Sequence, residues 1–337
     1  MSRTSFYAMM RVPKVPFVTR FDARKGECMS MKEIDLHMHS TVSDGSDTPD
    51  ELVRNVQKAG IRTFALTDHD TILGALEVEK LLRPEPECSS LEFFRGIEFS
   101  CRAEDESRFK CHLLGYQYDP ENEKFQYALK LGRGRRMQKL DSRIGYLRSH
   151  GAAFSDREID WLHSLESPGK PHIADLMIRD GYAENRQEAI DRIHCEEKIE
   201  TRIPADVAIE GILAAGGVPV WAHPLGGEGE EHISEAEFER RLQYLTGNRT
   251  GRNQDGDTCP AEDPAPAVMG IECWYSRYSE EEVSFLLRMA EKYGLLVSGG
   301  SDYHGTRKNI KLGELNTFGK PVMTDQLTII EELRKRV

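Results

Sequence analysis

Short apolar runs alternate with longer helix-like stretches over most of the chain from Met31 onward. A short apolar run bounded by turn residues is typical of a buried strand, and a strand followed by a helix-like stretch is typical of a β/α unit. The order therefore predicts an α/β protein built on a barrel-like parallel sheet. The predicted strands are 34–37, 64–67, 93–98, 111–116, 217–222, 268–272 and 295–300.

The first predicted helix has recognisable signals at both ends. Thr48 is suited to the N-cap, Pro49 to the first helical position, and Glu51 to the third position of a capping box. Gly60 is suited to the residue just beyond the helix, where a left-handed backbone is common. A helix between 49 and 59 is therefore expected.

Two stretches interrupt the β/α pattern. Between about 119 and 201 strand-like runs give way to charged helical sequence, which predicts a helical insertion, or cap, between barrel segments 31–118 and 202–337. Residues 246–267 are rich in Gly, Asp, Pro and Asn, which predicts a mobile loop. Residues 1–30 carry basic residues without the apolar core of a secretion signal, and we expect a disordered extension or an overlong start.

The composition narrows the possible partners. A formal net charge of −12 argues against stable binding of duplex nucleic acid, although bound divalent metals would offset that charge where an anionic substrate sits. The seven cysteines include no CxxC pair, which favours a reducing cytoplasm. No apolar run approaches the roughly 18 residues of a membrane span. The pattern indicates no particular oligomeric state.

Histidine and acidic residues stand at the ends of almost every predicted strand, where α/β barrels build their active sites. Each alone has an ordinary explanation: a surface histidine pair, a turn aspartate, or an N-cap for the next helix. Together they predict a multinuclear metal site, since they exceed what one tetrahedral ion needs and suit zinc, manganese or iron. The residues are His37, His39, Asp44, Asp68, His69, Asp70, Glu98, His112, His223, Asp302 and His304.

Several of these residues stand in ordered motifs that resemble the PHP (polymerase and histidinol phosphatase) family. The motifs are DLHMHSTVSDG at 35–45, LTDHDT at 66–71, GIE at 96–98, HLLGY at 112–116, AHP at 222–224 and SDYH at 301–304. The resemblance extends from about residue 33 to 315. It implies a distorted (β/α)7 barrel of the PHP type with a trinuclear site, and therefore a hydrolase acting on phosphoric ester bonds. Two or three divalent ions (manganese, zinc or iron) are the implied cofactors.

The resemblance also implies which residues hold each ion, and every position has the expected residue type. The implied ligands are His37, His39, Glu98 and Asp302 for the first ion, Glu98, His112 and His223 for the second, and Asp44, His69 and His304 for the third.

The insertion and the Ser-Asp-Gly turn resemble the branch that contains nucleoside 3′,5′-bisphosphate phosphatases and a 5′-to-3′ exoribonuclease. In that branch the cap helps to hold the substrate, and here Lys170 replaces the usual arginine of its Gly-Arg-Pro-His segment. His172 is the more available general acid, because the alternatives, His304 and His223, are both implied ligands. The candidate substrate-binding residues, each with solvation or packing as the alternative explanation, are Arg135, Arg136, Lys170, His172, Tyr275 and Arg277.

The expected function is hydrolysis of a phosphomonoester on a small nucleotide, such as a nucleoside 3′,5′-bisphosphate, by a metal-bridging hydroxide. The alternatives are 5′-to-3′ exonuclease action on short RNA, a histidinol-phosphate-like phosphatase, and an amidohydrolase-type enzyme that cleaves C–N bonds. A non-catalytic module stabilised by metal is a further alternative.

Overall fold

The structure is a computed structural model that describes residues 32–83, 91–104, 108–195, 199–227, 230–247, 250–252, 258–260 and 267–336. The extension expected over residues 1–30 lies outside this part of the chain. Of the loop expected over 246–267, the described residues include β7 (Thr250–Arg252) and β8 (Thr258–Pro260), which pair antiparallel.

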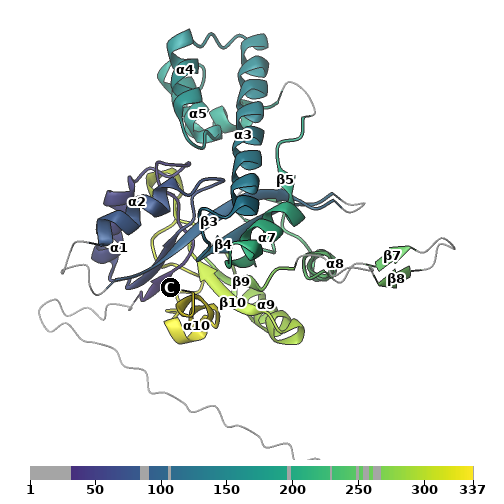
Figure 1. Ribbon diagram of the computed structural model, residues 1–337. Coiled ribbons are helices and arrows are strands. Elements are labelled where there is room, and N and C mark those ends of the chain that lie inside the picture. The colour runs from purple at the N-terminus through teal and green to yellow at the C-terminus, as the bar shows by residue number, and fades with distance from the viewer. Residues whose placement is uncertain are drawn as a thin grey trace, which may run out of the picture. The chain divides into compact units, whose positions relative to one another are not determined.

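Within the described residues, seven strands form a nearly closed barrel-like sheet in the order β1-β2-β3-β4-β6-β9-β10 (Figure 1). Backbone bonds close it between its first and last strands: Leu36 N donates to Gly299 O at 3.2 Å, and Asp302 N donates to His37 O at 2.8 Å. Ser301 Oγ also donates to Asp35 Oδ2 at 2.6 Å. The strands are β1 (Ile34–Asp35), β2 (Thr63–Leu66), β3 (Glu92–Arg102), β4 (Lys110–Tyr116), β6 (Val218–Trp221), β9 (Gly270–Tyr275) and β10 (Leu296–Gly300), and a short β5 (Ile203–Pro204) pairs with β3.

β4 runs antiparallel to both of its neighbours, β3 and β6, so the prediction of a parallel sheet is wrong for this strand. The physical reason is the short β3–β4 connection, across which Ala103 N bonds to Phe109 O at 2.9 Å. A short connection joins antiparallel strands, whereas parallel strands need a long crossover. The reversal brings the amino end of β4, and with it His112, to the rim where the parallel strands end.

β3 is longer than predicted, and Glu98 lies within it instead of at its end. The loop after β2 meets the strand there through a parallel bridge between His69 and Glu98. Glu98 therefore reaches the site from the wall of the barrel.

Helices pack around the sheet as the β/α pattern predicts (Figure 1). In α1 the predicted caps are confirmed: Thr48 N donates to Glu51 Oε2 at 2.9 Å, Glu51 N donates back to Thr48 Oγ1 at 3.3 Å, and Gly60 has a φ of 80°. The barrel helices are α1 (Pro49–Ala59), α2 (Leu73–Leu82), α7 (Ala205–Ala214), α8 (Glu235–Leu245), α9 (Glu280–Tyr293) and α10 (Ile329–Arg334).

Four helices occupy the stretch where a helical insertion is expected: α3 (Glu123–Ser149), α4 (Asp156–Ser164), α5 (Lys170–Arg179) and α6 (Arg186–Arg192). We call them the cap. The amino-terminal part of α3 packs on α7, and a Cβ added at Gly211 of α7 would lie 3.2 Å from the Ala128 Cβ. Farther along α3 the cap has its own apolar core, which includes Leu140, Leu147, Leu162 and Ile173.

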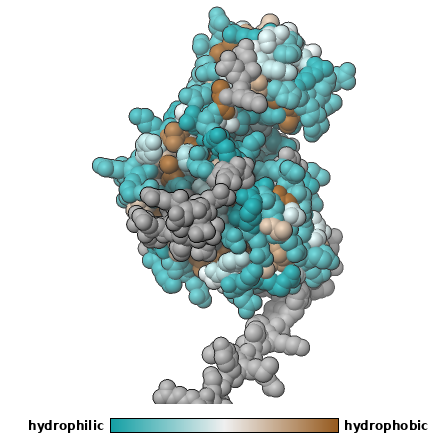
Figure 2. Space-filling model, turned by 90° about the vertical axis from the view of Figure 1, so that its right-hand side faces the viewer, coloured by the Kyte–Doolittle hydropathy of each residue, from teal (hydrophilic) through white to brown (hydrophobic). Residues whose placement is uncertain are grey.

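The coloured surface in Figure 2 is mainly hydrophilic, with small separate apolar patches. Among the described residues, every helix is too short or too polar to cross a lipid bilayer.

Candidate metal centre

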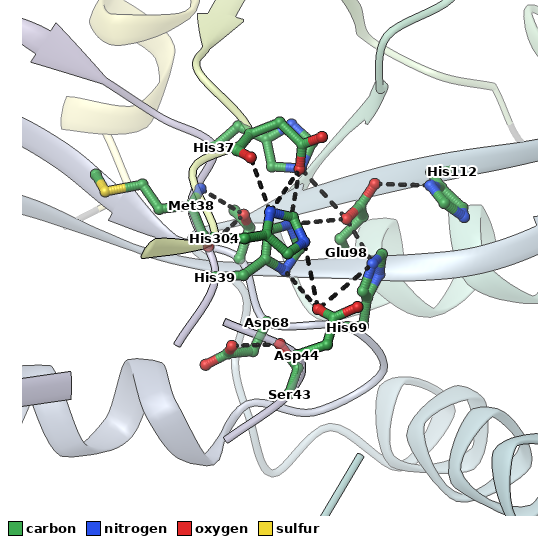
Figure 3. Close-up of polar contacts among 12 residues, drawn as sticks. His37, Met38, His39, Ser43, Asp44, Asp68, His69, Glu98, His112 and His304 are labelled. Carbon is green, nitrogen blue, oxygen red and sulfur yellow. Dashed lines mark hydrogen bonds and ion pairs between the residues drawn. The ribbon is translucent and has the colours of Figure 1, made fainter. Parts of the chain in front are cut away.

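Four buried side chains form the first group of donors: His37, His39, Glu98 and Asp302. The His37 and His39 Nε2 atoms lie 3.2 and 3.1 Å from Glu98 Oε2. His39 Nε2 also lies 3.2 Å from Asp302 Oδ1. One donor atom from each residue falls within a span of 4.8 Å, which is compact enough to surround one ion. Figure 3 shows His37, His39 and Glu98 of this group.

The second group shares Glu98 with the first. Glu98 Oε1 lies 3.0 Å from His112 Nδ1 and 3.2 Å from His223 Nε2, whereas its Oε2 atom faces the first group. One carboxylate therefore presents an oxygen to each group, the arrangement expected of a residue that bridges two ions.

The third group centres on the Asp44 carboxylate (Figure 3). Asp44 Oδ1 lies 3.3 Å from His304 Nε2, 3.9 Å from His39 Nδ1 and 4.0 Å from His69 Nε2. His39 thus adjoins this group as well as the first. The structure brings all nine sequence-predicted ligands together in these three groups.

Several donor atoms in the centre are buried without hydrogen-bond partners. They include His37 Nε2, both His39 ring nitrogens, Asp44 Oδ1 and Glu98 Oε2. Buried polar atoms without partners are costly, and divalent metals would satisfy imidazole nitrogens and carboxylate oxygens in this arrangement. The donor set therefore fits metal ions of the zinc, manganese or iron type.

A buried glutamate that the sequence analysis missed orients two of the ligands. His37 Nδ1 donates to Glu272 Oε1 at 3.0 Å, and the His223 backbone N donates to Glu272 Oε2 at 2.7 Å. His223 Nδ1 in turn faces Glu230 Oε2 at 3.1 Å. Because each Nδ1 holds its proton toward a carboxylate, Nε2 is the ring nitrogen that would lose its proton and offer a lone pair to a bound metal.

Asp302 is held in a similar way. Its Oδ2 atom accepts hydrogen bonds from Lys308 Nζ at 2.8 Å and Tyr275 Oη at 3.1 Å, so that Oδ1 faces His37 and His39. Asp302 has a φ of +61°, in the left-handed region that most residues avoid. Sparsely populated backbone conformations concentrate at functional sites, where the surrounding structure enforces them.

Asp68 does not join a donor group. It accepts hydrogen bonds from Ser40 N at 2.8 Å, Ser40 Oγ at 2.7 Å and Ser43 Oγ at 2.6 Å. It therefore fixes the loop that carries Asp44. It does not cap the next helix either, because the N-cap of α2 is Ile72.

Neighbouring carboxylates set the charge of two of the histidines. Burial lowers the pKa of His39, but contacts with Asp302 and Glu98 outweigh it and raise the pKa to about 9. Burial is likewise outweighed at His223, where Glu230 and Glu98 raise the pKa to about 10. Without bound metal the His39 and His223 rings are both doubly protonated and positively charged at neutral pH. Metal binding must therefore displace one proton from each ring.

The cap covers the third donor group. Ser167 Oγ donates to His69 O at 2.6 Å, and a Cβ added at Gly169 would lie 3.5 Å from Asp44 Cβ. His172, in the first turn of α5, is buried, and its Nδ1 accepts a hydrogen bond from Gly169 N at 3.0 Å. Burial and the Arg307 charge lower the pKa of His172 to about 4, so that the ring is neutral at pH 7 with its proton on Nε2.

The other candidate substrate residues occupy different surroundings. Arg136 Nε donates to Asp70 Oδ2 at 2.6 Å, and Arg135 bonds to the backbone of Glu200. Lys170 Nζ bonds to Ile190 O at 3.1 Å within the cap. Arg277 is exposed on the turn after β9. Tyr275 contacts the ligand Asp302, His172 lies near Asp44, and Arg136 lies beside the ligand His69 through Asp70, so these three candidates are near the donor groups.

A cavity of about 440 Å³ opens beside the second donor group. Both His112 and His223 line it, together with three basic residues, Lys110, Arg202 and Arg241. An anionic group that enters this cavity would meet His112, His223 and these positive charges, together with the carboxylates of Glu230 and Glu231, which line the same cavity.

The barrel and its buried donor groups define the class of a metal-dependent hydrolase. Residues 35–194 match the family model described as the PHP domain. A 5′-3′ exoribonuclease of Haemophilus influenzae is 28% identical over 84% of this chain and 94% of that protein. A 3′,5′-nucleoside bisphosphate phosphatase of Chromobacterium violaceum is 25% identical over 81% of this chain and 88% of that protein.

The solved structures agree with this class. A Bifidobacterium adolescentis protein assigned as a metal-dependent phosphoesterase superposes with a TM-score of 0.69 and 26% identity, covering 90% of this chain and 96% of that one. Residues 35–194 thus match the PHP domain, and most of the chain is similar to a protein assigned as a metal-dependent phosphoesterase. Three of the chain's donors, His223, Asp302 and His304, lie beyond the matched residues and nevertheless complete the groups.

Proposed function

We propose that the protein hydrolyses a phosphomonoester of a small nucleotide, such as a nucleoside 3′,5′-bisphosphate. The single observation that carries this proposal is a set of three adjoining donor groups, the second of which lines a cavity that also bears basic side chains. The bisphosphate phosphatase name of the Chromobacterium violaceum relative supports the nucleotide substrate.

The nine donor residues would hold two or three divalent ions of manganese, zinc or iron. When bound, such ions lower the pKa of a water molecule and neutralise phosphoryl oxygens, which supplies both a nucleophile and charge stabilisation. Glu98, which faces two groups, would keep two of the ions close together.

The protein's own residues position the substrate. The His172 ring, neutral and protonated on Nε2, would donate a hydrogen bond to a phosphoryl or leaving-group oxygen near Asp44. The Arg307 guanidinium, whose Nη1 bonds to Asp44 O at 3.4 Å, would add a positive charge on the same side. His172 and His304 are the proposed donors of a proton to the leaving oxygen. Because His172 is neutral at pH 7, it would act as this acid only after the dianionic substrate had raised its pKa.

The direct test is an assay of purified, manganese-supplemented protein against adenosine 3′,5′-bisphosphate, AMP and histidinol phosphate. We expect phosphate release from the bisphosphate, loss of activity on chelation, and loss in Glu98→Gln while the fold is retained. No release from any substrate by protein whose metal content is confirmed would exclude the proposal and favour amide substrates.

A second candidate is 5′-to-3′ exonuclease action on short RNA, which the name of the Haemophilus influenzae relative favours. A short 5′-phosphorylated RNA in the same assay separates the two. Release of mononucleotides from its 5′ end faster than phosphate release from the bisphosphate would make the exonuclease the main activity.

We further propose a reducing compartment, the cytoplasm, as the site of action. Cys101 and Cys111 lie directly opposite each other on β3 and β4, and both are free thiols. Two cysteines placed in this way would readily be bridged in an oxidising compartment.

A further inference from the structure

A row of basic side chains lies on one face of α3, and the first of them, Arg136, reaches the barrel rim. Arg136, Lys139 and Arg143 follow one another at spacings of three and four residues, which places them on the same side of a helix. Arg136 anchors this face to the barrel rim: its Nε bonds to Asp70 at 2.6 Å and its Nη2 bonds to Ser100 Oγ at 3.2 Å.

Arg202 connects this helix face with the cavity. It directly precedes β5, whose Ile203 pairs with Cys101 at the end of β3. Its Nη1 donates to Cys111 O at 3.3 Å, next to the ligand His112, and its side chain lines the cavity beside the second donor group. The positive charges of Arg143, Arg202 and Arg136 act on Lys139, so the four side chains share one region.

Three of these basic residues lack acidic partners. Among the described residues, no carboxylate forms an ion pair with Lys139, Arg143 or Arg202. Arg143 is only 8% exposed, its Nε has no hydrogen-bond partner, and the Cys195 thiol is the side chain bonded to it.

A buried positive charge without a counter-charge is costly, and native proteins usually pair such a group. The group is also unusual in a chain whose net charge is −12. Both features indicate that the missing counter-charge comes from a ligand.

We propose that Lys139, Arg143 and Arg202 bind a second phosphate group of the substrate, separate from the phosphoryl group that is cleaved at the donor groups. This inference rests on the proposed function and deepens it: the substrates are nucleotides that carry two phosphate groups. Three convergent cations match a terminal phosphate, which carries nearly two negative charges, better than an internal phosphodiester, which carries one.

The test compares adenosine 3′,5′-bisphosphate with adenosine 3′-monophosphate and 5′-monophosphate on metal-loaded protein. We expect the wild type to prefer the bisphosphate. Lys139→Gln should lower kcat/KM for the bisphosphate about ten- to hundredfold, as the loss of one hydrogen bond to a charged group implies, and leave both monophosphates unchanged. Lys139→Arg, which keeps the charge, should restore most of the preference.

Lys130→Gln is the matched control, because Lys130 is exposed on the same helix. We expect it to behave as the wild type. Equal loss of activity on all three substrates in Lys139→Gln, or no loss on any, would overturn the inference.

A failure of the proposed function would be seen separately. If the wild type hydrolyses none of the three compounds, calorimetric titration with the bisphosphate still tests the site. The manganese-loaded wild type must then bind the bisphosphate more tightly than either monophosphate, and Lys139→Gln must lose that difference. Equal affinities of the wild type for the bisphosphate and the monophosphates would exclude the second phosphate site as well.

Discussion

Glu272 supports two of the three donor groups at once, although it belongs to none of them. Its two oxygens bond to the His37 ring and to the His223 backbone, and the residue is fully buried. Partners of this kind fix the tautomer and orientation of a metal-binding histidine and raise its basicity.

Replacing Glu272 by glutamine keeps the shape of the side chain but removes its negative charge. We expect Glu272→Gln to weaken metal binding about ten- to hundredfold, with turnover recovering in part at high metal concentration. Metal titration and elemental analysis of the purified variant measure this. Glu291→Gln, at an exposed position of α9, is the control. Unchanged metal affinity in Glu272→Gln would show that the carboxylate has no role in orienting His37.

At the scale of single residues, the sequence indicated the candidate donor residues but not the residues that orient them by hydrogen bonds. His37 and His39 stand in a run of alternating residues after a strand, where imidazoles have few structural uses. Glu272 ends the predicted strand 268–272 but stands in none of the recognised motifs, and the observed strand continues past it to Tyr275. Glu230 and Lys308 stand in loops, where charged residues are common. Only the tertiary arrangement shows which of these charges are near the metal centre.

The contact between α3 and the barrel depends on a close approach at Asp70. A Cβ added at Gly132 would lie 3.1 Å from Asp70 Oδ1, and Arg136, one turn later, bonds to Asp70 Oδ2. Asp70 also accepts a hydrogen bond from Ser100 N at 3.0 Å. The cap is therefore attached directly beside the ligand His69.

Removing the Arg136 side chain leaves the buried Asp70 carboxylate unpaired. We expect Arg136→Ala to lower the free energy of unfolding by about 3 kcal/mol, as for other broken buried ion pairs, and to raise KM because the cap loses its position. Urea denaturation and steady-state kinetics measure the two effects. Arg133→Ala, which breaks the more exposed pair with Glu166, should cost at most about 1 kcal/mol. Equal costs for the two variants would contradict the assigned role.

Element positions were predictable where local signals exist, as at the caps of α1. The direction of β4 was not, because an apolar run reads the same for a parallel and an antiparallel strand. The short connection between β3 and β4 was the available sign that β4 runs antiparallel. The regular β/α pattern of the rest of the chain favoured a parallel strand instead. The structure still places His112 in the second donor group, because the reversal of β4 exchanges the end of the strand that reaches the rim.

For the whole molecule, the donor groups concentrate negative charge in the interior of a chain that is already acidic. Asp44, Glu98 and Asp302 are almost fully enclosed, and burial alone would disfavour their ionised forms. Bound cations would offset this charge, so metal binding and folding stability are coupled.

Chelation should therefore lower the thermal midpoint as well as abolish activity. If the free metal concentration was one hundred times the dissociation constant, removing the metal from one site lowers the free energy of unfolding by about 2.7 kcal/mol. Differential scanning calorimetry with chelator, followed by re-addition of manganese, checks the size and the reversibility of the change. A lowered midpoint with unchanged turnover would favour a non-catalytic, metal-stabilised module. An unchanged midpoint would show that the metal contributes nothing to the fold.

The closure of the barrel also sets the order in which the protein matures. Asp35 and Ser301, which join the first and last strands, stand 266 residues apart, and the first donor group combines His37 with Asp302 across the same seam. On the ribosome, His37 and His39 emerge long before their partner Asp302 is synthesised. The nascent chain therefore lacks the complete first group until its last strand has emerged, and the enzyme acquires its full set of ions only after translation is nearly finished.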